Sequence, residues 1–171
     1  MTLAFGPALK QPDQRCCGAC CVVVARLLRA AESAGPTRSL AGFPAEALAT
    51  HRRLTSAADG LGGLQLPWPR ALGTPPWAIA RALGILEGVR YRVRLARWTS
   101  RDDEIAEAVV DHPVAIYVGS PALPRHVTLA IAAEGDGLRV YDPASGGLVT
   151  LARDSFRVAG WSVPWFVVLP R

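Results

Sequence analysis

The sequence predicts an α+β domain in which helices come first and antiparallel strands follow. The first half of the chain places apolar residues at three-four spacing, which is typical of helices with one buried face. The second half shows alternating apolar positions and hairpin turns, which indicate strands. Helices that precede an antiparallel sheet pack beside it as a separate layer. A length of 171 residues suits one domain over 1–171.

Three helices are expected in the first half. Residues 17–31 carry apolar side chains at positions 17, 20, 21, 24, 27 and 28, which form one buried face. Residues 44–54 begin at a proline, a residue favoured at the first helical position. The third helix is expected over residues 74–86, with Thr74 as its N-cap. The stretch 55–76 between them lacks periodicity and predicts a long loop.

Strands begin near residue 89. Residues 89–97 alternate as a strand with one solvated face does. A helix is expected after Thr99 or Ser100, because the acids of RDDEIAEAVV suit the positive end of a helix dipole. The apolar run PVAIYVG at 113–119 predicts a buried strand.

The C-terminal third predicts a meander of strands. Residues 126–151 divide into three strands, with turns at 134–137 and 143–147. The first turn contains Gly-Asp-Gly, a strong hairpin signal. WFVVLP at 165–170 predicts the last strand.

Composition excludes several classes of function. The net charge is +5, but the arginines are spread along the chain and not interleaved with aromatic residues, so nucleic-acid binding is not expected. No segment reaches the about 20 apolar residues that a membrane span needs, and the first ten residues lack the features of a secretory signal. All four cysteines lie close together, which suits a reducing compartment. We therefore expect a cytoplasmic protein.

The cysteines lie in QPDQRCCGACCVVVARLL, residues 11–28. A zinc site would need a second, separated pair of ligands, and neighbouring helical residues point about 100° apart. Inert packing suits Cys20 and Cys21, which continue the apolar face. Cys17 stands at the mouth of the helix, where a third hypothesis, a nucleophile, is open. No cofactor and no metal is expected.

The position of Cys17 suits nucleophilic chemistry. The dipole and free N–H groups of a helix N-terminus favour the thiolate form of a cysteine. Gly18 would let a substrate backbone approach the sulfur closely. Gln11, six residues upstream, supplies a side-chain N–H donor that could stabilise an oxyanion.

A base and its orienting partner are found far downstream. His126 opens an apolar strand, and Asp142 ends the next one. Residue 134 lies midway between them, so a hairpin folded there brings the aspartate beside the imidazole. The other histidines have plainer interpretations: His112 belongs to a turn, and His51 to a polar helix face.

The pattern resembles the papain-like cysteine peptidases, and most closely the bacteriocin-processing, double-glycine-leader cysteine peptidases. That family has a glutamine six residues before a Cys-Gly at the head of a helix. A histidine leading an apolar strand, an Asp-Pro one hairpin later and a phenylalanine before the last strands follow. The matching residues are Gln11, Cys17-Gly18-Ala19-Cys20, His126 in HVTLAI, Asp142 in VYDPASGG and Phe156 in LARDSF.

The resemblance implies a papain-like fold, in which an N-terminal helical lobe with the nucleophile at a helix N-terminus packs on a C-terminal antiparallel sheet. If the roles of the matching family residues apply here, Cys17 is the nucleophile, His126 is the general base and then the acid, and Asp142 is the orienting residue. Gln11 and the backbone N–H of Cys17 would form the oxyanion hole. The implied substrate is a peptide or an amide, cleaved through a thioester acyl-enzyme.

This chain departs from the family in one position and in its context. Cys16 stands where the family usually has an acidic residue before the nucleophile. Leader-trimming members are commonly fused to a transporter, so a separate transporter is a candidate partner here. An inactive papain-like binding module, an amidase and an acyl transferase stay open as alternatives. Trp68 and Trp77 could roof a cleft or pack in the core, and the Leu-Gly-Gly at 61–63 is interpreted as loop flexibility.

Overall fold

The computed structural model describes the chain except for residues 1–2, 35–39, 59–62, 99 and 153–156, and the side chains of 32–34. Its first half contains three helices, joined by short 3-10 turns. The helices are α1 (Cys17–Ala34), α2 (Phe43–Thr55) and α3 (Pro76–Glu87), and the 3-10 turns are η1 (Pro7–Leu9), η2 (Leu40–Gly42) and η3 (Arg70–Leu72).

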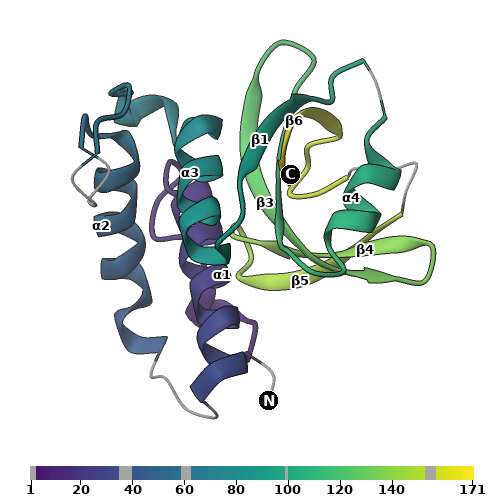
Figure 1. The fold of residues 1–171 in the computed structure, drawn as a ribbon, viewed down its shortest axis with the longest axis horizontal. Helices are drawn as coiled ribbons and strands as arrows, with labels where there is room; N and C mark the ends of the chain where they lie inside the picture. Colours follow the sequence, from purple (N-terminus) through teal and green to yellow (C-terminus); the bar gives the residue numbers. More distant parts are fainter. Residues whose placement is uncertain (1–2, 35–39, 59–62, 99, 153–156) are drawn as a thin grey trace.

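The second half forms one antiparallel sheet in the order β1-β6-β2-β3-β4-β5. Figure 1 shows α1, α2 and α3 on one side of this sheet and α4 (Asp102–Ala108) on the other. The α+β class, with a helical N-terminal lobe packed on a C-terminal antiparallel sheet, is therefore confirmed. The strands are β1 (Tyr91–Leu95), β2 (Val114–Gly119), β3 (Pro124–Glu134), β4 (Gly137–Asp142), β5 (Gly147–Ala152) and β6 (Val163–Pro170).

The sheet has a hydrophobic core on each face. Ala115 and Tyr117 of β2 join the core that includes α1 and α3, whereas Val114, Ile116 and Val118 join the core under α4. All six residues of β2 are buried. This double burial explains why PVAIYVG is an unbroken apolar run, since a strand covered on both faces has no solvated side to alternate.

The expected helix starts are correct in place but not in their caps. Pro75 holds the N-cap position of α3 without a side-chain hydrogen bond, so the expectation for Thr74 is wrong. Thr74 is instead buried, and its carbonyl accepts a hydrogen bond from the Tyr117 hydroxyl at 2.8 Å. In α4 the N-cap is Arg101, not Ser100, and Thr99 lies outside the described residues.

The N-terminal segment is fastened to the turn between β4 and β5. The N–H of Gly6 donates to the carbonyl of Gly146 at 2.9 Å, and the N–H of Gln11 donates to the carbonyl of Pro143 at 2.8 Å. The Tyr141 hydroxyl donates to the carbonyl of Leu9 at 2.5 Å. These bonds join residues more than 130 positions apart and hold Gln11 beside the end of β4.

Gly146 makes this attachment possible. Its φ is +77°, and a Cβ at this position would lie 2.7 Å from the nitrogen of Lys10 and would overlap the carbonyl of Gly6. We expect Gly146→Ala to destabilise the protein by about 2–4 kcal/mol, from backbone strain plus steric overlap with the N-terminal segment.

The matched control is Gly135→Ala in the hairpin between β3 and β4. Gly135 has a φ of +61°, but the space that an added methyl group would take is open, so only the strain of about 1 kcal/mol is expected. Urea denaturation of both variants measures the difference. Equal losses of stability would contradict the role given to Gly146.

Candidate active site

Cys17 is the first residue of α1, as the sequence predicts. The chain turns into the helix through Asp13, whose carboxylate accepts hydrogen bonds from the N–H groups of Arg15 at 2.8 Å and Cys16 at 2.9 Å. This turn occupies two of the free donors near the helix entry and sets the direction in which the helix begins.

The structure gives Gly18 a role in helix packing. A Cβ on Gly18 would lie 2.7 Å from Cδ1 of Ile79 and 2.9 Å from Cβ of Thr74. The glycine therefore lets the start of α1 pack closely against the start of α3. Close packing between the helices is therefore one reason for a glycine at this position.

The hairpin between β3 and β4 brings His126 and Asp142 together. Its turn joins Glu134 to Gly137, as the position of residue 134 midway between them predicts. Nε2 of His126 lies 2.7 Å from Oδ1 of Asp142, and both side chains are buried. The N–H of Ala144 donates to the same carboxylate oxygen at 3.0 Å, so the carboxylate is held from two directions.

Cys17 also acts on the imidazole of His126. Burial alone would lower the pKa of His126, but hydrogen bonds with Asp142 and Cys17, together with their negative charges, outweigh it and raise that pKa to about 9. Since Nε2 faces Asp142, the bond with the thiol uses Nδ1. The imidazole is therefore held between the carboxylate and the sulfur, in the order that the sequence predicts.

Asp142 is suited to remain ionised. Burial would raise its pKa, yet the hydrogen bonds from His126 and from the N–H of Ala144 lower it below the usual value. A carboxylate kept negative in a buried place stabilises the protonated form of the ring beside it.

The other three cysteines have different contacts. The Cys16 sulfur lies 3.9 Å from that of Cys20, and the Cys21 thiol contacts the carbonyl of Val127 at 3.6 Å. All three are completely buried. A hydrogen bond with Cys16 and burial raise the pKa of Cys20, and burial raises that of Cys21, so both favour the thiol form. Inert packing therefore describes Cys20 and Cys21 well.

Metal ligation was the remaining alternative for the cysteines. Among the residues that the structure describes, no group of three or more His, Cys, Asp or Glu side chains is placed to hold a metal ion.

Gln11 lies near the end of β4 through its backbone bond to Pro143. Its Oε1 atom is buried and has no hydrogen-bond partner among the described residues. The oxygen and nitrogen of a side-chain amide exchange places by a simple rotation, so this amide can present an N–H at the same point. A buried amide atom without a partner at this point suits the oxyanion donor that the sequence predicts.

The other predicted positions are partly corrected. His51 is buried, so its assignment to a polar helix face is wrong: it shares a face of α2 with Ala47 and Thr55. His112 lies 3.3 Å from a carboxylate oxygen of Glu87. Phe156, and Leu61 and Gly62 of the Leu-Gly-Gly, lie outside the described residues.

The two tryptophans of the long loop region pack on each other. Trp68 and Trp77 meet edge to face with ring centroids 5.1 Å apart. Trp77 also lines a groove beside β1. Packing is thus the observed alternative for this pair.

Sequence reasoning missed two aromatic residues around the site. Tyr117 is buried, and burial and then the charges of Cys17 and Cys21 raise its pKa, which places it beside the sulfurs. Trp165 donates from Nε1 to the carbonyl of Ser120 at 2.9 Å and fixes the loop that leads into β3. Only the register of β2 against β3 and β6 reveals these neighbours, and no local pattern encodes it.

Comparisons with known proteins give a fold neighbour but no relative by sequence. No family model and no curated protein matches the chain significantly. One similar solved structure is the peptidase domain of Streptococcus ComA, a bi-functional ABC transporter involved in a quorum-sensing pathway. The match has a TM-score of 0.48 and 18% sequence identity, and covers 95% of this chain and 96% of that one. That neighbour is of the class to which the sequence motifs point, but a likeness this low supports no argument about activity.

The buried pair of His126 and Asp142 makes stability depend on pH. The raised pKa of His126, about 9, means that the folded protein holds a proton that the unfolded chain loses above pH 6.5. This contribution is complete below pH 6.5 and is lost as pH rises to about 9, by on the order of 3 kcal/mol.

We therefore expect the wild-type free energy of unfolding to fall between pH 6.5 and 9 relative to that of His126→Gln. Urea denaturation at several pH values measures it. Parallel pH profiles of the two proteins would show that the imidazole gains no proton affinity on folding.

Proposed function

We propose that the protein is a cysteine-type hydrolase that cleaves a peptide or amide bond, with Cys17 as nucleophile. The observation that supports this most directly is the arrangement of three groups. Cys17 lies at a helix N-terminus, close enough to His126 to raise the pKa of its ring, and the ring of His126 is held at 2.7 Å by Asp142. A nucleophile, its base and an orienting carboxylate in this order are the parts of covalent acyl transfer.

The first chemical step forms the acyl-enzyme. Because the pKa of His126 is about 9, its ring carries the proton at neutral pH, and Cys17 attacks the carbonyl carbon of the scissile bond as a thiolate paired with the imidazolium. The carbonyl oxygen becomes negative, and the Gln11 amide and the N–H of Cys17 are the proposed donors to it. The imidazolium of His126 then protonates the leaving amine as the C–N bond breaks, which leaves a thioester on Cys17.

The second step releases the product. His126 is again neutral and removes a proton from a water molecule, whose oxygen attacks the thioester carbon. The intermediate collapses by breaking the C–S bond, and a carboxylic acid leaves. The thiolate of Cys17 and the imidazolium of His126 are then restored.

Two wider proposals rest on the sequence alone. The first is that a separate transporter is a candidate partner, and the second is that the protein acts in the cytoplasm. The helices of the described segments include none that is long and apolar enough to cross a membrane.

A chemical test of the nucleophile uses iodoacetamide and mass spectrometry. Cys17 is expected to be alkylated at least about tenfold faster than Cys16, Cys20 or Cys21, because those three are completely buried, whereas Cys17 is 5% exposed and lies beside His126. Cys17→Ala should lower the hydrolysis of a peptide library about a thousandfold or more, whereas Cys20→Ala should retain it.

Equal alkylation of all four cysteines would contradict the proposal that Cys17 is the nucleophile. Selective alkylation of Cys17 without hydrolysis of any peptide or amide would favour a binding module that has kept the site but not the activity.

The orienting role of Asp142 has its own signature in the pH profile. Hydrolysis should decline above pH 9, because the imidazolium that protonates the leaving amine has a pKa of about 9. Asp142→Asn removes a main cause of that raised pKa, so the alkaline limb should move to lower pH.

The profile of kcat/KM against pH measures the shift, and Asp136→Asn in the exposed hairpin turn is the matched control. If Asp142→Asn lowers the rate equally at every pH, the carboxylate acts on structure and not on the ring.

A further inference from the structure

We propose that the free edge of β1 is a docking site for an extended peptide segment in which acidic residues alternate with apolar ones. Three features meet along this strand: an edge that pairs with no strand and on which the Leu95 carbonyl accepts a hydrogen bond from Nε of Arg101 at 3.3 Å, a mainly apolar groove on one face, and Arg92 and Arg94 on the other. The proposal concerns binding and does not depend on the hydrolytic activity of Cys17.

The first feature is the outward edge of the strand. In the sheet β1 pairs only with β6, so its other side has no strand beside it among the described residues. The N–H of Arg171 donates to the carbonyl of Arg90, and the N–H of Ala96 donates to the carbonyl of Trp165. Residues 90, 92, 94 and 96 are therefore the hydrogen-bonded positions of the ladder.

The alternate residues turn their peptide groups outward. These are Tyr91, Val93 and Leu95, and Pro170, which has no N–H to donate, stands opposite the first of them. No described residue extends the sheet beyond this edge. We call the outward N–H and C=O groups of these three residues the β1 edge. An added strand would find its hydrogen-bonding positions there, as in β-augmentation.

The second feature is a groove of about 660 Å³ between α3 and β1. Its apolar wall leaves large side chains in contact with solvent: Ile85 is 52% exposed and Val93 is 36% exposed. Leu95, next along the same face of β1, is 42% exposed. A strand added to the β1 edge would place every second side chain over this face. The apolar residues that line the groove are Trp77, Ala80, Ile85, Val89, Tyr91 and Val93.

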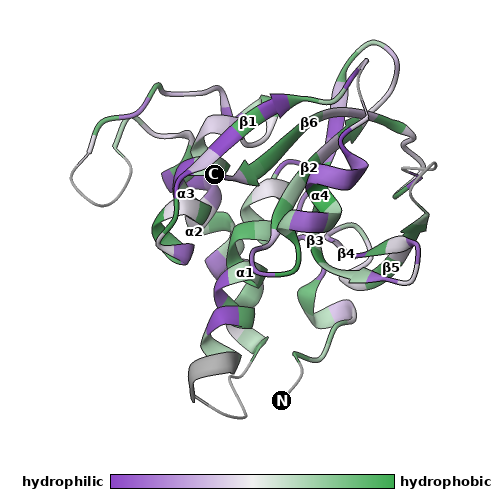
Figure 2. Ribbon diagram, turned by 45° about the vertical axis from the view of Figure 1, so that its right-hand side comes forward, coloured by the Kyte–Doolittle hydropathy of each residue, from purple (hydrophilic) through white to green (hydrophobic). Residues whose placement is uncertain are grey.

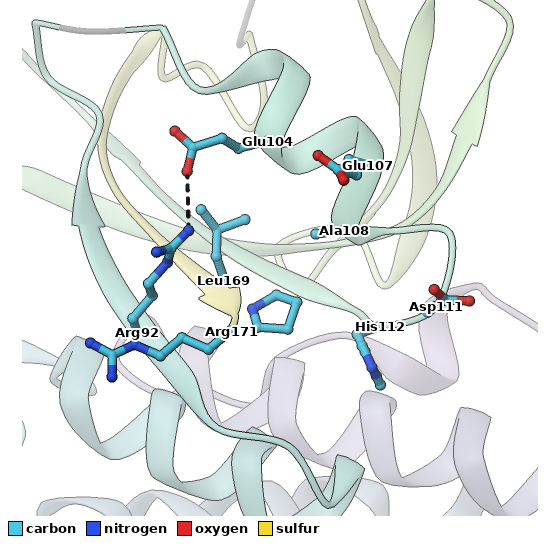
Figure 3. Close-up of a pocket in the computed structure, with 9 residues that line it drawn as sticks. Arg92, Glu104, Glu107, Ala108, Asp111, His112, Leu169 and Arg171 are labelled. Carbon is cyan, nitrogen blue, oxygen red and sulfur yellow. Dashed lines mark ion pairs between the residues drawn. The ribbon is translucent and has the colours of Figure 1, made fainter.

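The third feature is the positive charge on the opposite face of β1. Figure 2 shows β1 along the rim of the sheet, with hydrophilic segments that correspond to its arginines. Arg92 reaches across to Glu104 of α4 at 3.6 Å (Figure 3), and Glu104 also pairs with Arg101. Arg94 has no ion pair among the described residues and is exposed.

These charges identify the partner. Two copies of this chain joined edge to edge around Val93 would place Arg92 of one copy opposite Arg94 of the other. Like charges in that position destabilise a strand pair, and charged edges of this kind prevent self-association. An acidic strand turns the same contact into an attraction. The remaining side chains of that strand must be apolar, because they face the groove.

The test uses the full chain with the Cys17→Ala substitution, so that no cleavage accompanies binding. The probe is a fluorescein-labelled eight-residue peptide that alternates Glu and Val, and fluorescence anisotropy measures its affinity. Control peptides replace Glu by Lys, or replace two central residues by Pro. Only the first peptide should bind, because the lysine peptide has the wrong charge and the proline peptide cannot complete a ladder.

Two substitutions and a matched control locate the site. Arg94→Glu should weaken binding about tenfold, whereas Arg52→Glu on the exposed face of α2 should leave it unchanged. Val93→Pro removes one outward N–H but no hydrogen bond of the β1–β6 ladder, so it should abolish binding and leave the circular dichroism spectrum unaltered.

Hydrogen exchange separates strand addition from diffuse attraction. The bound peptide should slow the exchange of the amides of Val93 and Leu95, whereas those of Arg92 and Arg94 are already in the ladder and should not change. Absence of binding, equal effects of Arg94→Glu and Arg52→Glu, or binding without this alternate protection would each overturn the proposal. A dimer of the free protein that dissociates on Val93→Pro would also overturn it, in favour of a second copy as the occupant.

Discussion

The hydrogen bond between His126 and Asp142 is the interaction on which the rest of the site depends. Two buried polar groups at 2.7 Å satisfy each other, and neither could be buried alone without a large cost in free energy. The bond fixes which ring nitrogen faces the sulfur, so the direction of proton transfer follows from it. Because both residues belong to one hairpin, the sheet itself holds the distance.

The third group of the site, Cys17, lies at the start of helix α1 in the other half of the chain. Its first residue meets the imidazole only because α1 packs against the β3 side of the sheet and against the start of α3. The interface between the two lobes is thus also the place where sulfur and ring meet. The remaining cysteines are buried in that interface, and Cys17 is the one beside His126.

The local pattern of the sequence predicts most of the fold and much of the site. Apolar spacing places α1, α2 and α3 to within a few residues, and the midpoint between His126 and Asp142 locates their hairpin. Spacing could not predict the contacts between distant elements. The burial of Thr74 and the close packing of Gly18 both arise where α1 contacts α3. No local pattern in a single amino-acid sequence indicates that contact.

The turn between β4 and β5 follows directly on Asp142, and it also forms the hydrogen bonds that hold the segment ending in Gln11. A protein engineer who inserts residues there would disturb the orienting carboxylate and the proposed oxyanion donor in a single step. The hairpin at Gly135 points into open space and offers a safer position for a reporter or an affinity tag. Tolerance to insertion therefore differs sharply between two neighbouring turns of the same sheet.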